Sequence, residues 1–436
     1  MNKKNLSERS LKAVWHPCSQ MKQHETLPLV PIARGEGVWL YDLSGRRYLD
    51  AISSWWVNLF GHANPQINNA IKDQLAKLEH VMLAGFTHEP VVKLSERLNE
   101  LAPGNLGHCF YSSDGASAIE TALKMSFHYW YNNDQPEKNN FVSLQNGYHG
   151  ETLGALSVTD VALFSDIYAP LLRYSARVTT PDWRYAEEGE SPNNYALRAV
   201  TILEKYLAEN HAKTAALVVE PLVQGAAGMG MYHPDYLKHA SKICNKYRVH
   251  LIADEIAVGF GRTGTMFACE QANITPDFLC LAKGLSGGYL PLSVVMTNDA
   301  VYQTFYHEEV TRGFLHSHTH AGNALACCAA LATLDIFEQD KIIEANLAKT
   351  NYLNDAAKPL MSHPKVRNFR NCGMIWAFEV ETVDLNFSRK FFQMALNQGL
   401  LLRPLGNTVY FMPPYIINKQ DMDFLVVGIL QALDSC

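Results

Sequence analysis

The hydrophobic and polar positions of the chain follow two alternating patterns from about Asn64 onward. Short continuous apolar runs indicate strands that are buried on both faces, and apolar residues spaced three or four apart indicate helices with one buried face. The runs predict strands at 108–112, 141–144, 217–220, 250–254, 278–282 and 292–296. Helical spacing is clear at 67–78 and 94–101. Because strands alternate with helices, we predict an α/β fold around a mainly parallel sheet.

The pattern changes after Gly322. An alanine-rich segment at 323–337 predicts a long helix, which is followed by further elements. These are strands near 373–379 and 409–412 and helices near 387–397 and 420–433. At 436 residues the chain exceeds the usual size of one domain. We therefore expect a large domain at 58–322 and a smaller α/β domain at 323–436, with residues 1–57 packing on the smaller one.

Composition narrows the class of protein. Charged residues make up 18 % and apolar residues 47 % of the chain, which favours extensive burial, including at a subunit interface. A net charge of −6 without a basic tract argues against nucleic acid as a partner. No uncharged apolar run is long enough to span a bilayer, and the first residues lack the apolar stretch of a signal peptide. Nine cysteines without a CxxC pair predict free thiols in a reducing cytoplasm.

The segment LIADEIAVGFGRTG at 251–264 carries the first chemical signal. Its Asp254 is followed 29 positions later by Lys283, in LAKGLSGG, and each residue comes after an apolar run and before glycine-rich turns. An aspartate that keeps a pyridine nitrogen protonated and a lysine that binds an aldehyde are what pyridoxal 5'-phosphate requires. Both side chains would lie at strand ends, where open α/β sheets bind ligands. The alternative, a capping carboxylate and a solvated lysine, does not account for the pair.

Two further segments fit the same cofactor. SSDGASAIE at 112–120 begins a helix directly after a strand, and a helix start offers free N–H groups to a phosphate. There Gly115 permits a close approach, although an ordinary capped helix has the same pattern. In NGYHG at 146–150, Tyr148 is placed to stack on a pyridine ring, whereas His149 is interpreted as a supporting residue.

Alternate histidines at 316, 318 and 320 suggest a metal site, because they would face one side of an extended segment. No carboxylate or cysteine lies nearby to complete the ligand set. We therefore predict no metal.

The run DEIAVGFGRTG resembles the signature of the class III, or omega, aminotransferases. Four narrower motifs are WHP at 15–17, SSWW at 53–56, VVEPLVQGAAGMGMYHP and LLRPLGNTVYFMPPY. They resemble the members that convert 8-amino-7-oxononanoate to 7,8-diaminononanoate in biotin biosynthesis, with S-adenosylmethionine as the amino donor. The likeness runs from Trp15 to Tyr415. It implies the fold type I architecture of aspartate aminotransferase, pyridoxal phosphate as cofactor, and a homodimer with active sites at the subunit interface.

The resemblance also implies residue roles. The catalytic residues are Lys283, Asp254 and Tyr148. The cofactor is bound by Gly115, Ala116, Tyr148, Asp254, Lys283, His318 and Thr319, with Thr319 supplied by the neighbouring subunit. The substrates are contacted by Trp55, Tyr148, Lys283, Ser317 and Arg403, where Arg403 binds the far carboxylate of the oxononanoate. Trp56, Arg262 and Tyr410 are additional candidates for the substrate pocket.

The chain departs from some members of the family at three places. Cys18 stands where they have tyrosine, Ser317 and His318 where they have Gly-Pro, and Ala116 where they have serine. Four alternatives remain: another omega-aminotransferase using lysine, ornithine, 4-aminobutyrate or β-alanine, an aminomutase of the same fold, a non-catalytic protein, and a metal hydrolase. Intact Asp254, Lys283 and Thr319 argue against the non-catalytic protein.

Overall fold

A computed structural model describes residues 3–173 and 175–436 of the chain. Its largest element is a seven-stranded sheet with the order β4-β12-β11-β10-β7-β5-β6. The strands are β4 (His108–Ser112), β5 (Asn140–Leu144), β6 (Ala176–Val178), β7 (Thr214–Val219), β10 (His250–Asp254), β11 (Phe278–Leu281) and β12 (Ser293–Thr297). β12 pairs antiparallel with both of its neighbours, and the other pairs are parallel. The predicted α/β fold with a mainly parallel sheet is therefore confirmed.

Helices cover both faces of this sheet. Because successive residues of a strand point to opposite faces, each strand contributes side chains to two separate apolar clusters. Val218, Ile252 and Cys280 pack in one apolar cluster with α5 (Gly115–Asn132), α6 (Leu153–Val158) and α10 (Asp299–Phe305). The alternate residues, such as Leu217 and Leu251, pack in a second cluster with α8 (Pro192–Asn210) and α9 (Asp235–Tyr247). Burial on both faces explains why these strands appear in the sequence as uninterrupted apolar runs.

Three more helices flank the large sheet near β4. They are α3 (Pro65–Leu75), α4 (Glu89–Leu101) and α11 (Ala324–Gln339), and α11 packs against both of the others. The long helix that we predicted at 323–337 is therefore present, and it contacts the large sheet's helices as well as α12 (Ile342–Ala356). The domain boundaries drawn from the sequence remain a prediction.

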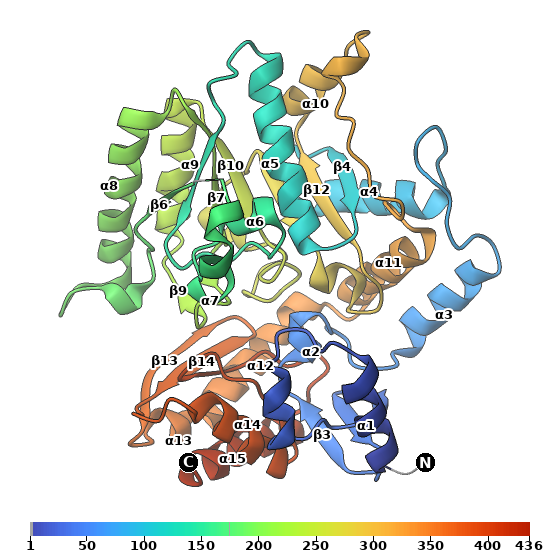
Figure 1. Ribbon diagram of the computed structural model, residues 1–436, viewed down its shortest axis with the longest axis vertical. Coiled ribbons are helices and arrows are strands. Elements are labelled where there is room, and N and C mark those ends of the chain that lie inside the picture. The colour runs from blue at the N-terminus through green and yellow to red at the C-terminus, as the bar shows by residue number, and fades with distance from the viewer. Residues whose placement is uncertain (1–2, 174) are drawn as a thin grey trace.

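The N-terminal and C-terminal parts of the chain both lie below the large sheet, with the C-terminus on the left in the view of Figure 1. One small sheet has the order β1 (Ile32–Glu36), β2 (Trp39–Asp42), β3 (Arg47–Asp50) and β15 (Leu400–Leu401), and a second has the order β13 (Val366–Cys372), β14 (Ile375–Val380) and β16 (Thr408–Phe411). In the first, Leu49 pairs with Leu400, so N-terminal strands share a sheet with the C-terminal part. The helices here are α1 (Lys3–Ala13), α13 (Lys358–Met361), α14 (Phe387–Asn397) and α15 (Lys419–Asp434).

The remaining elements are short. β8 (Val223–Gln224) and β9 (Gly230–Met231) form a small hairpin, α7 (Ala162–Ser165) is a single turn, and α2 (Ser53–Trp56) carries the two adjacent tryptophans. Turns of 3-10 helix lie at Met21–Glu25, Asp166–Leu171, Trp183–Tyr185, Ala268–Ala272, Lys283–Ser286 and Val310–Arg312. Among the described residues, no helix has the length and apolar character needed to cross a membrane.

Candidate active site

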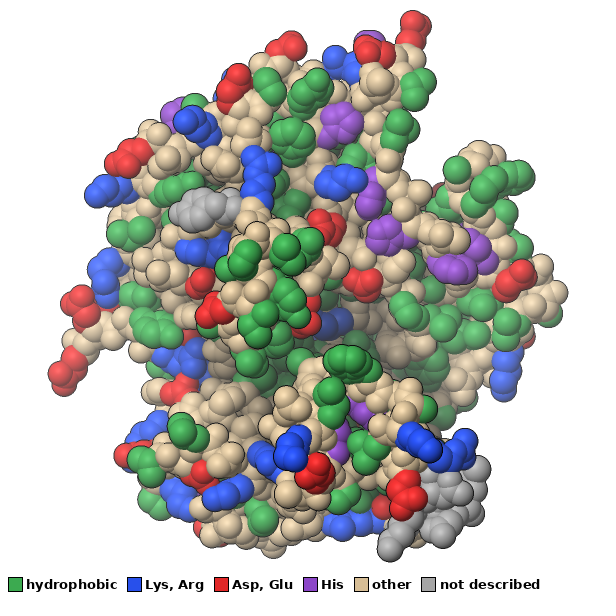
Figure 2. Space-filling model, in the orientation of Figure 1, with side chains coloured by type: hydrophobic (Ala, Val, Ile, Leu, Met, Phe, Trp, Pro, Cys, Tyr) green, Lys and Arg blue, Asp and Glu red, His purple; other side chains and the backbone are tan. Residues whose placement is uncertain are grey.

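A cavity of about 540 Å³, the cofactor cavity, lies at the carboxyl ends of the strands of the large sheet. Its lining comes from the residues that directly follow β4, β5, β7, β10 and β11, with Trp56 and Val57 of the N-terminal segment on the other side. Figure 2 shows the hollow between the upper and lower parts of the molecule. The described lining residues include Gly115, Ala116, Tyr148, Asp254 and Lys283, which the sequence predicted to bind one cofactor.

Asp254 is the last residue of β10 and is 4 % exposed. Its Oδ1 accepts a hydrogen bond from the backbone N–H of Ile256 at 3.1 Å, and its Oδ2 lies 2.8 Å from Nδ1 of the buried His149. Among the described residues, the Nε2 atom of His149 has no hydrogen-bond partner. A buried carboxylate that is oriented by a histidine can hold a proton on a facing ring nitrogen.

Lys283 begins the turn after β11, two residues beyond the strand. Its backbone has a φ of 44°, which is unusual for a lysine and turns the side chain into the cavity. The amine lies 4.7 Å from the ring centroid of Trp56. Desolvation lowers the pKa of Lys283, while Asp254 and Glu220 oppose that shift. A lowered pKa makes the neutral, nucleophilic amine more accessible.

The start of α5 provides an anion site beside these residues. Asp114 caps the helix by accepting hydrogen bonds from the backbone N–H and the hydroxyl of Ser117, both at 3.0 Å. The N–H groups of Gly115 and Ala116 belong to the first turn, which has no carbonyl partners within the helix. A side chain at position 115 would come within 2.9 Å of Ile256, so glycine lets the start of α5 pack closely against Ile256 in the cavity wall. This geometry suits a phosphate.

Tyr148 is held at two points. Its backbone N–H donates to Oε2 of Glu220 at 2.9 Å, and its hydroxyl donates to Oε1 of Glu151 at 2.8 Å. Burial raises the pKa of Glu220 to about 7, and His149 opposes that shift. Sequence reasoning did not single out either glutamate as a site residue. The available signal was that Glu220 ends the predicted strand at 217–220, so that its carboxylate joins the same edge of the sheet as Asp254.

The SSWW motif forms a left-handed turn. Ser53, Ser54, Trp55 and Trp56 have φ values of 50°, 46°, 72° and 75°. Non-glycine residues rarely adopt this conformation, and it persists where surrounding contacts enforce it. Asp50 accepts hydrogen bonds from the backbone N–H and the hydroxyl of Ser54 at 2.8 and 2.7 Å, and Ser53 donates to the carbonyl of Met412 at 2.6 Å.

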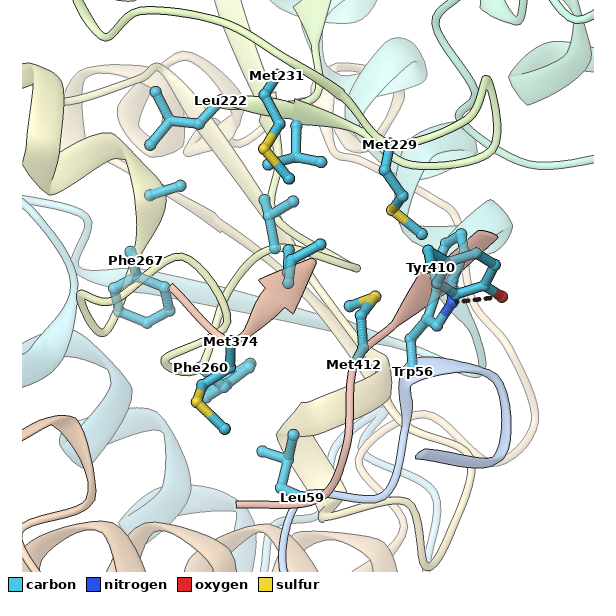
Figure 3. Packing of buried hydrophobic residues seen from close by; sticks show 14 of the residues in the cluster. Trp56, Leu59, Leu222, Met229, Met231, Phe260, Phe267, Met374, Tyr410 and Met412 are labelled. Atoms are coloured by element: carbon cyan, nitrogen blue, oxygen red, sulfur yellow. Dashed lines mark hydrogen bonds between the residues drawn. The ribbon is translucent and has the colours of Figure 1, made fainter. Parts of the chain in front are cut away.

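The turn directs the two tryptophans to different places. Trp56 is 5 % exposed and lies over Lys283. Its indole N–H donates to the hydroxyl of Tyr410 at 3.1 Å, and Figure 3 draws this bond as a dashed line. Trp55 is 42 % exposed and lies 5.0 Å from the guanidinium of Arg403, measured from its ring centroid. Trp55 and Arg403 line a neighbouring cavity rather than the one that holds Lys283.

Arg262 and Tyr410 lie behind this surface. Arg262 is 1 % exposed, donates to the carbonyl of Pro413 at 2.9 Å and lies over the ring of Tyr415. Neither Arg262 nor Tyr410 lines the cofactor cavity. Their contacts fix the segment that follows β16 and the ring of Trp56, so in this structure they act on the site through other residues.

The segment at 316–320 lies outside the cofactor cavity of its own chain. The three histidines have different neighbours: Nδ1 of His316 is 3.0 Å from Nζ of Lys124, Nδ1 of His318 is 3.2 Å from Oγ of Ser113, and His320 packs on His80. Within the described residues, no group of three or more His, Cys, Asp or Glu side chains is arranged to hold a metal ion. Ser317 and Thr319 are exposed, and the carbonyl of Thr319 lies 2.9 Å from Nε2 of His80.

Comparison with known proteins gives a consistent result. Residues 20–433 match the family model described as aminotransferase class III. A Helicobacter pylori protein named adenosylmethionine-8-amino-7-oxononanoate aminotransferase is 47 % identical over 99 % of this chain and 98 % of its own length. A Geobacter sulfurreducens protein of the same name is 39 % identical over 97 % of this chain and 96 % of its own length.

Solved structures agree in fold. The crystal structure of the Methanocaldococcus jannaschii protein of that name superposes with a TM-score of 0.93 at 34 % identity, covering 100 % of both chains. An omega transaminase from Pseudomonas jessenii, in complex with PMP, superposes with a TM-score of 0.94 at 31 % identity, covering 99 % of this chain and 98 % of its own.

Proposed function

The chain belongs to the class III aminotransferases, and on that basis we propose that it converts 8-amino-7-oxononanoate to 7,8-diaminononanoate with S-adenosylmethionine as the amino donor. The family predicted from DEIAVGFGRTG is thereby confirmed, as are the enzyme class and the pyridoxal phosphate cofactor that the family uses. The observation that carries the specific reaction is the full-length identity to relatives named for it. This reaction belongs to biotin biosynthesis.

The residues of the cofactor cavity fit pyridoxal phosphate. The cavity combines a buried carboxylate, an enclosed lysine, an aromatic ring on a turn and a helix start. When bound, the cofactor supplies an electron sink for the electrons released at the α carbon of the amino donor.

Each group in the cavity has a defined task in this proposal. Lys283 binds the cofactor's aldehyde and carries the proton removed from the donor's α carbon. Asp254 holds the proton on the ring nitrogen, and His149 orients Asp254. Tyr148 stacks on the ring, and Gly115 and Ala116 offer backbone N–H groups to the phosphate.

The substrate contacts are likewise proposed. Trp55 forms an aromatic wall for the aliphatic part of the oxononanoate, and Arg403 binds its carboxylate, because guanidinium matches that group with two parallel hydrogen bonds. Trp56 lies over Lys283 and is therefore the better candidate for contact with the reacting carbon of either substrate. Ser317 is proposed to contact substrate from the 316–320 segment.

We also propose that the enzyme acts as a homodimer. Thr319 and His318 are exposed or half-buried in one chain and lie outside its cofactor cavity, as residues that complete a neighbour's phosphate site would. A dimer would bring the two segments together at an interface with twofold symmetry. The nine cysteines are free, which supports the proposed location in the reducing cytoplasm.

A single-turnover absorbance experiment tests the proposed reaction. Purified holoenzyme is mixed separately with S-adenosylmethionine, lysine or 4-aminobutyrate, without an acceptor, and the absorbance of the bound cofactor is followed. We expect S-adenosylmethionine alone to bleach the band, and 8-amino-7-oxononanoate to restore it. Bleaching by one of the other amines instead would keep the aminotransferase and refute the proposed donor.

A further inference from the structure

A second cavity of about 620 Å³, here called the N-terminal cavity, lies between the N-terminal segment and α14. Its walls are mainly apolar and include Leu27, Leu29, Leu40, Phe392 and Leu401. The polar groups include the guanidinium groups of Arg389 and Arg403. A largely apolar cavity of this size with a few convergent polar groups is typical of a small-molecule site.

The N-terminal cavity borders the cofactor cavity. Trp55 lines the N-terminal cavity and its neighbour Trp56 lines the cofactor cavity, so adjacent residues of the chain belong to the two cavities. Cys18 gives a second connection: it lines the N-terminal cavity, and burial followed by the charge of Glu151 raises the pKa of its thiol. Because Glu151 lines the cofactor cavity, the two cavities meet near Cys18.

The two cavities carry opposite charges. The cofactor cavity is lined by Asp114, Glu151, Glu220 and Asp254, with Lys283 and His149 as the basic residues. The described lining of the N-terminal cavity has Arg389, Arg403 and two histidines, and no acidic side chain. In a site that excludes much of the water, such a contrast favours an anionic substrate group in the N-terminal cavity, whereas the anion site at the start of α5 in the cofactor cavity is reserved for the cofactor's phosphate.

Arg389 and Arg403 each have guanidinium N–H groups that can donate further hydrogen bonds. Nη2 of Arg403 donates to the carbonyl of Cys18 at 2.7 Å, and Nη2 of Arg389 donates to the carbonyl of Gln23 at 3.3 Å. Neither forms an ion pair within the part of the chain that the structure describes. A guanidinium has five N–H donors, and a carboxylate is a stronger acceptor than a backbone carbonyl. An aliphatic acid entering the cavity would therefore find two cations without acidic partners.

We propose that Arg389 acts with Arg403 to bind the carboxylate-bearing arm of the acceptor in the N-terminal cavity, while the acidic cofactor cavity retains the cationic amino donor. This rests on the proposed function, and it adds a specificity-determining residue that the family motifs do not include. The two substrates then share Lys283 but extend in different directions, with charge deciding which direction each takes. Arg389 lies on α14, outside the segments that carry the family's motifs.

Substitution of Arg389 tests the proposal. Arg389→Gln should raise the KM for 8-amino-7-oxononanoate by about ten-fold or more, because one charged hydrogen-bonding partner is lost. The rate and concentration dependence of bleaching by S-adenosylmethionine should be unchanged, which also shows that the variant is folded. The methyl ester of the acceptor, which lacks the charge, should have the same KM with both enzymes. An unchanged acid KM, or an equal change for the ester, would overturn the proposal.

Lys390→Gln is the matched control. Lys390 is the next residue of α14, is exposed and pairs with Asp384, and it does not line the cavity. Its substitution removes the same charge from the same helix. An acceptor KM that rises as much in this variant as in Arg389→Gln would show a general charge effect and would refute a role for Arg389.

Calorimetric titration of the holoenzyme separates this inference from the proposed reaction. Nonanoate should bind more tightly than nonan-1-ol or nonylamine, and Arg389→Gln should weaken that preference, with Arg403 retaining part of it. Binding of nonanoate with this pattern would support the cavity assignment even if the enzyme failed to transaminate the oxononanoate. Equal affinity for the acid and the alcohol would overturn the assignment, whatever the enzyme's substrate.

Discussion

At the residue scale, the proposed chemistry depends on a lysine whose surroundings lower its pKa. Lys283 lies in a cavity where desolvation opposes its charge, with Trp56 over its amine. The sequence predicted Lys283 and Asp254 as a pair because both follow buried strands, and the structure has Asp254 at the end of β10 and Lys283 just after β11. Their individual roles remain proposals. The family resemblance gave Trp55 as a substrate contact and Trp56 as an additional candidate, but the adjacency of the two residues does not say which cavity each ring enters.

Replacement of Lys283 is the most direct test at this scale. Lys283→Ala should lower turnover by about 10⁴-fold or more, because the variant lacks both the amine that binds the aldehyde and the proton carrier. Absorbance spectra of the variant should also lack the band of lysine-bound cofactor. Undiminished turnover in Lys283→Ala would end the proposed mechanism.

Arg403 gives a second test, which separates the two substrates. Arg403→Ala should raise the KM for the oxononanoate roughly ten- to a hundred-fold, since a charged two-pronged contact is lost. Bleaching by S-adenosylmethionine should be largely preserved. Stopped-flow measurement of each half-reaction checks this, and an equal loss in both halves would contradict the assignment of Arg403 to the acceptor's carboxylate.

At the element scale, the strands buried on both faces were the most predictable. β4 and β10 have the bounds that their apolar runs predicted, whereas β6 has three residues and gives no pattern to detect. β13 was missed because its sequence, VRNFRNC, is mostly polar and its pairing is interrupted between Arg367 and Arg370. The left-handed turn at Ser53–Trp56 was also beyond reach, because serine and tryptophan have no preference for positive φ.

The residue that follows β10, Glu255, leads us to expect that the stability of the fold depends on pH. Glu255 is buried, and its carboxylate accepts hydrogen bonds at 2.7 Å from the backbone N–H groups of Ala268 and Cys269. Burial raises the pKa of Glu255 from 4.5 to about 7 despite those bonds. The folded state therefore favours the protonated carboxyl, so this contribution to stability is complete below pH 4.5 and is lost as pH rises through 7.

Thermal unfolding from pH 5 to pH 8 checks this expectation. The contribution of Glu255 is on the order of 3 kcal/mol across that range. In Glu255→Gln the melting temperature should fall less steeply with rising pH than in the unsubstituted protein. At pH 5 the variant's melting temperature should be the lower of the two. Glu220, whose pKa is raised in the same direction, keeps part of the slope. The control Glu204→Gln, at an ion pair with Lys246, should keep the full slope. A slope that is the same in all three proteins would refute the prediction.

At the scale of the whole molecule, the N- and C-terminal parts of the chain act as one unit. β3 pairs with β15, Ser53 donates to the carbonyl of Met412, and Arg262 donates to that of Pro413. The first two of these contacts and the bond from Trp56 to Tyr410 join segments about 350 residues apart around the two tryptophans. The sequence led us to expect that the N-terminal segment packs on the C-terminal part, and the domain bounds remain a prediction. The sequence could not show that these contacts lie beside Lys283.

The proposed dimer gives a prediction at the same scale. Thr319→Ala should weaken cofactor binding, and Lys283→Ala should be inactive. When the two variants are co-expressed with different tags, mixed dimers should contain one intact site if Thr319 serves the partner's cofactor. If the two chains pair at random, half of the dimers are mixed and each has one of its two sites intact. The preparation should then have about a quarter of the normal specific activity. If Thr319 acts within its own chain, every site carries a defect and the purified mixed dimer should show no recovery.

The left-handed turn at Ser53–Trp56 has a consequence for enzyme engineering. In this turn, neighbouring side chains enter two cavities, Trp56 beside Lys283 and Trp55 beside Arg403. A library at position 55 should therefore change the range of acceptors that bind beside Arg403, whereas a library at position 56 should change the reaction of both substrates, because Trp56 lies over Lys283.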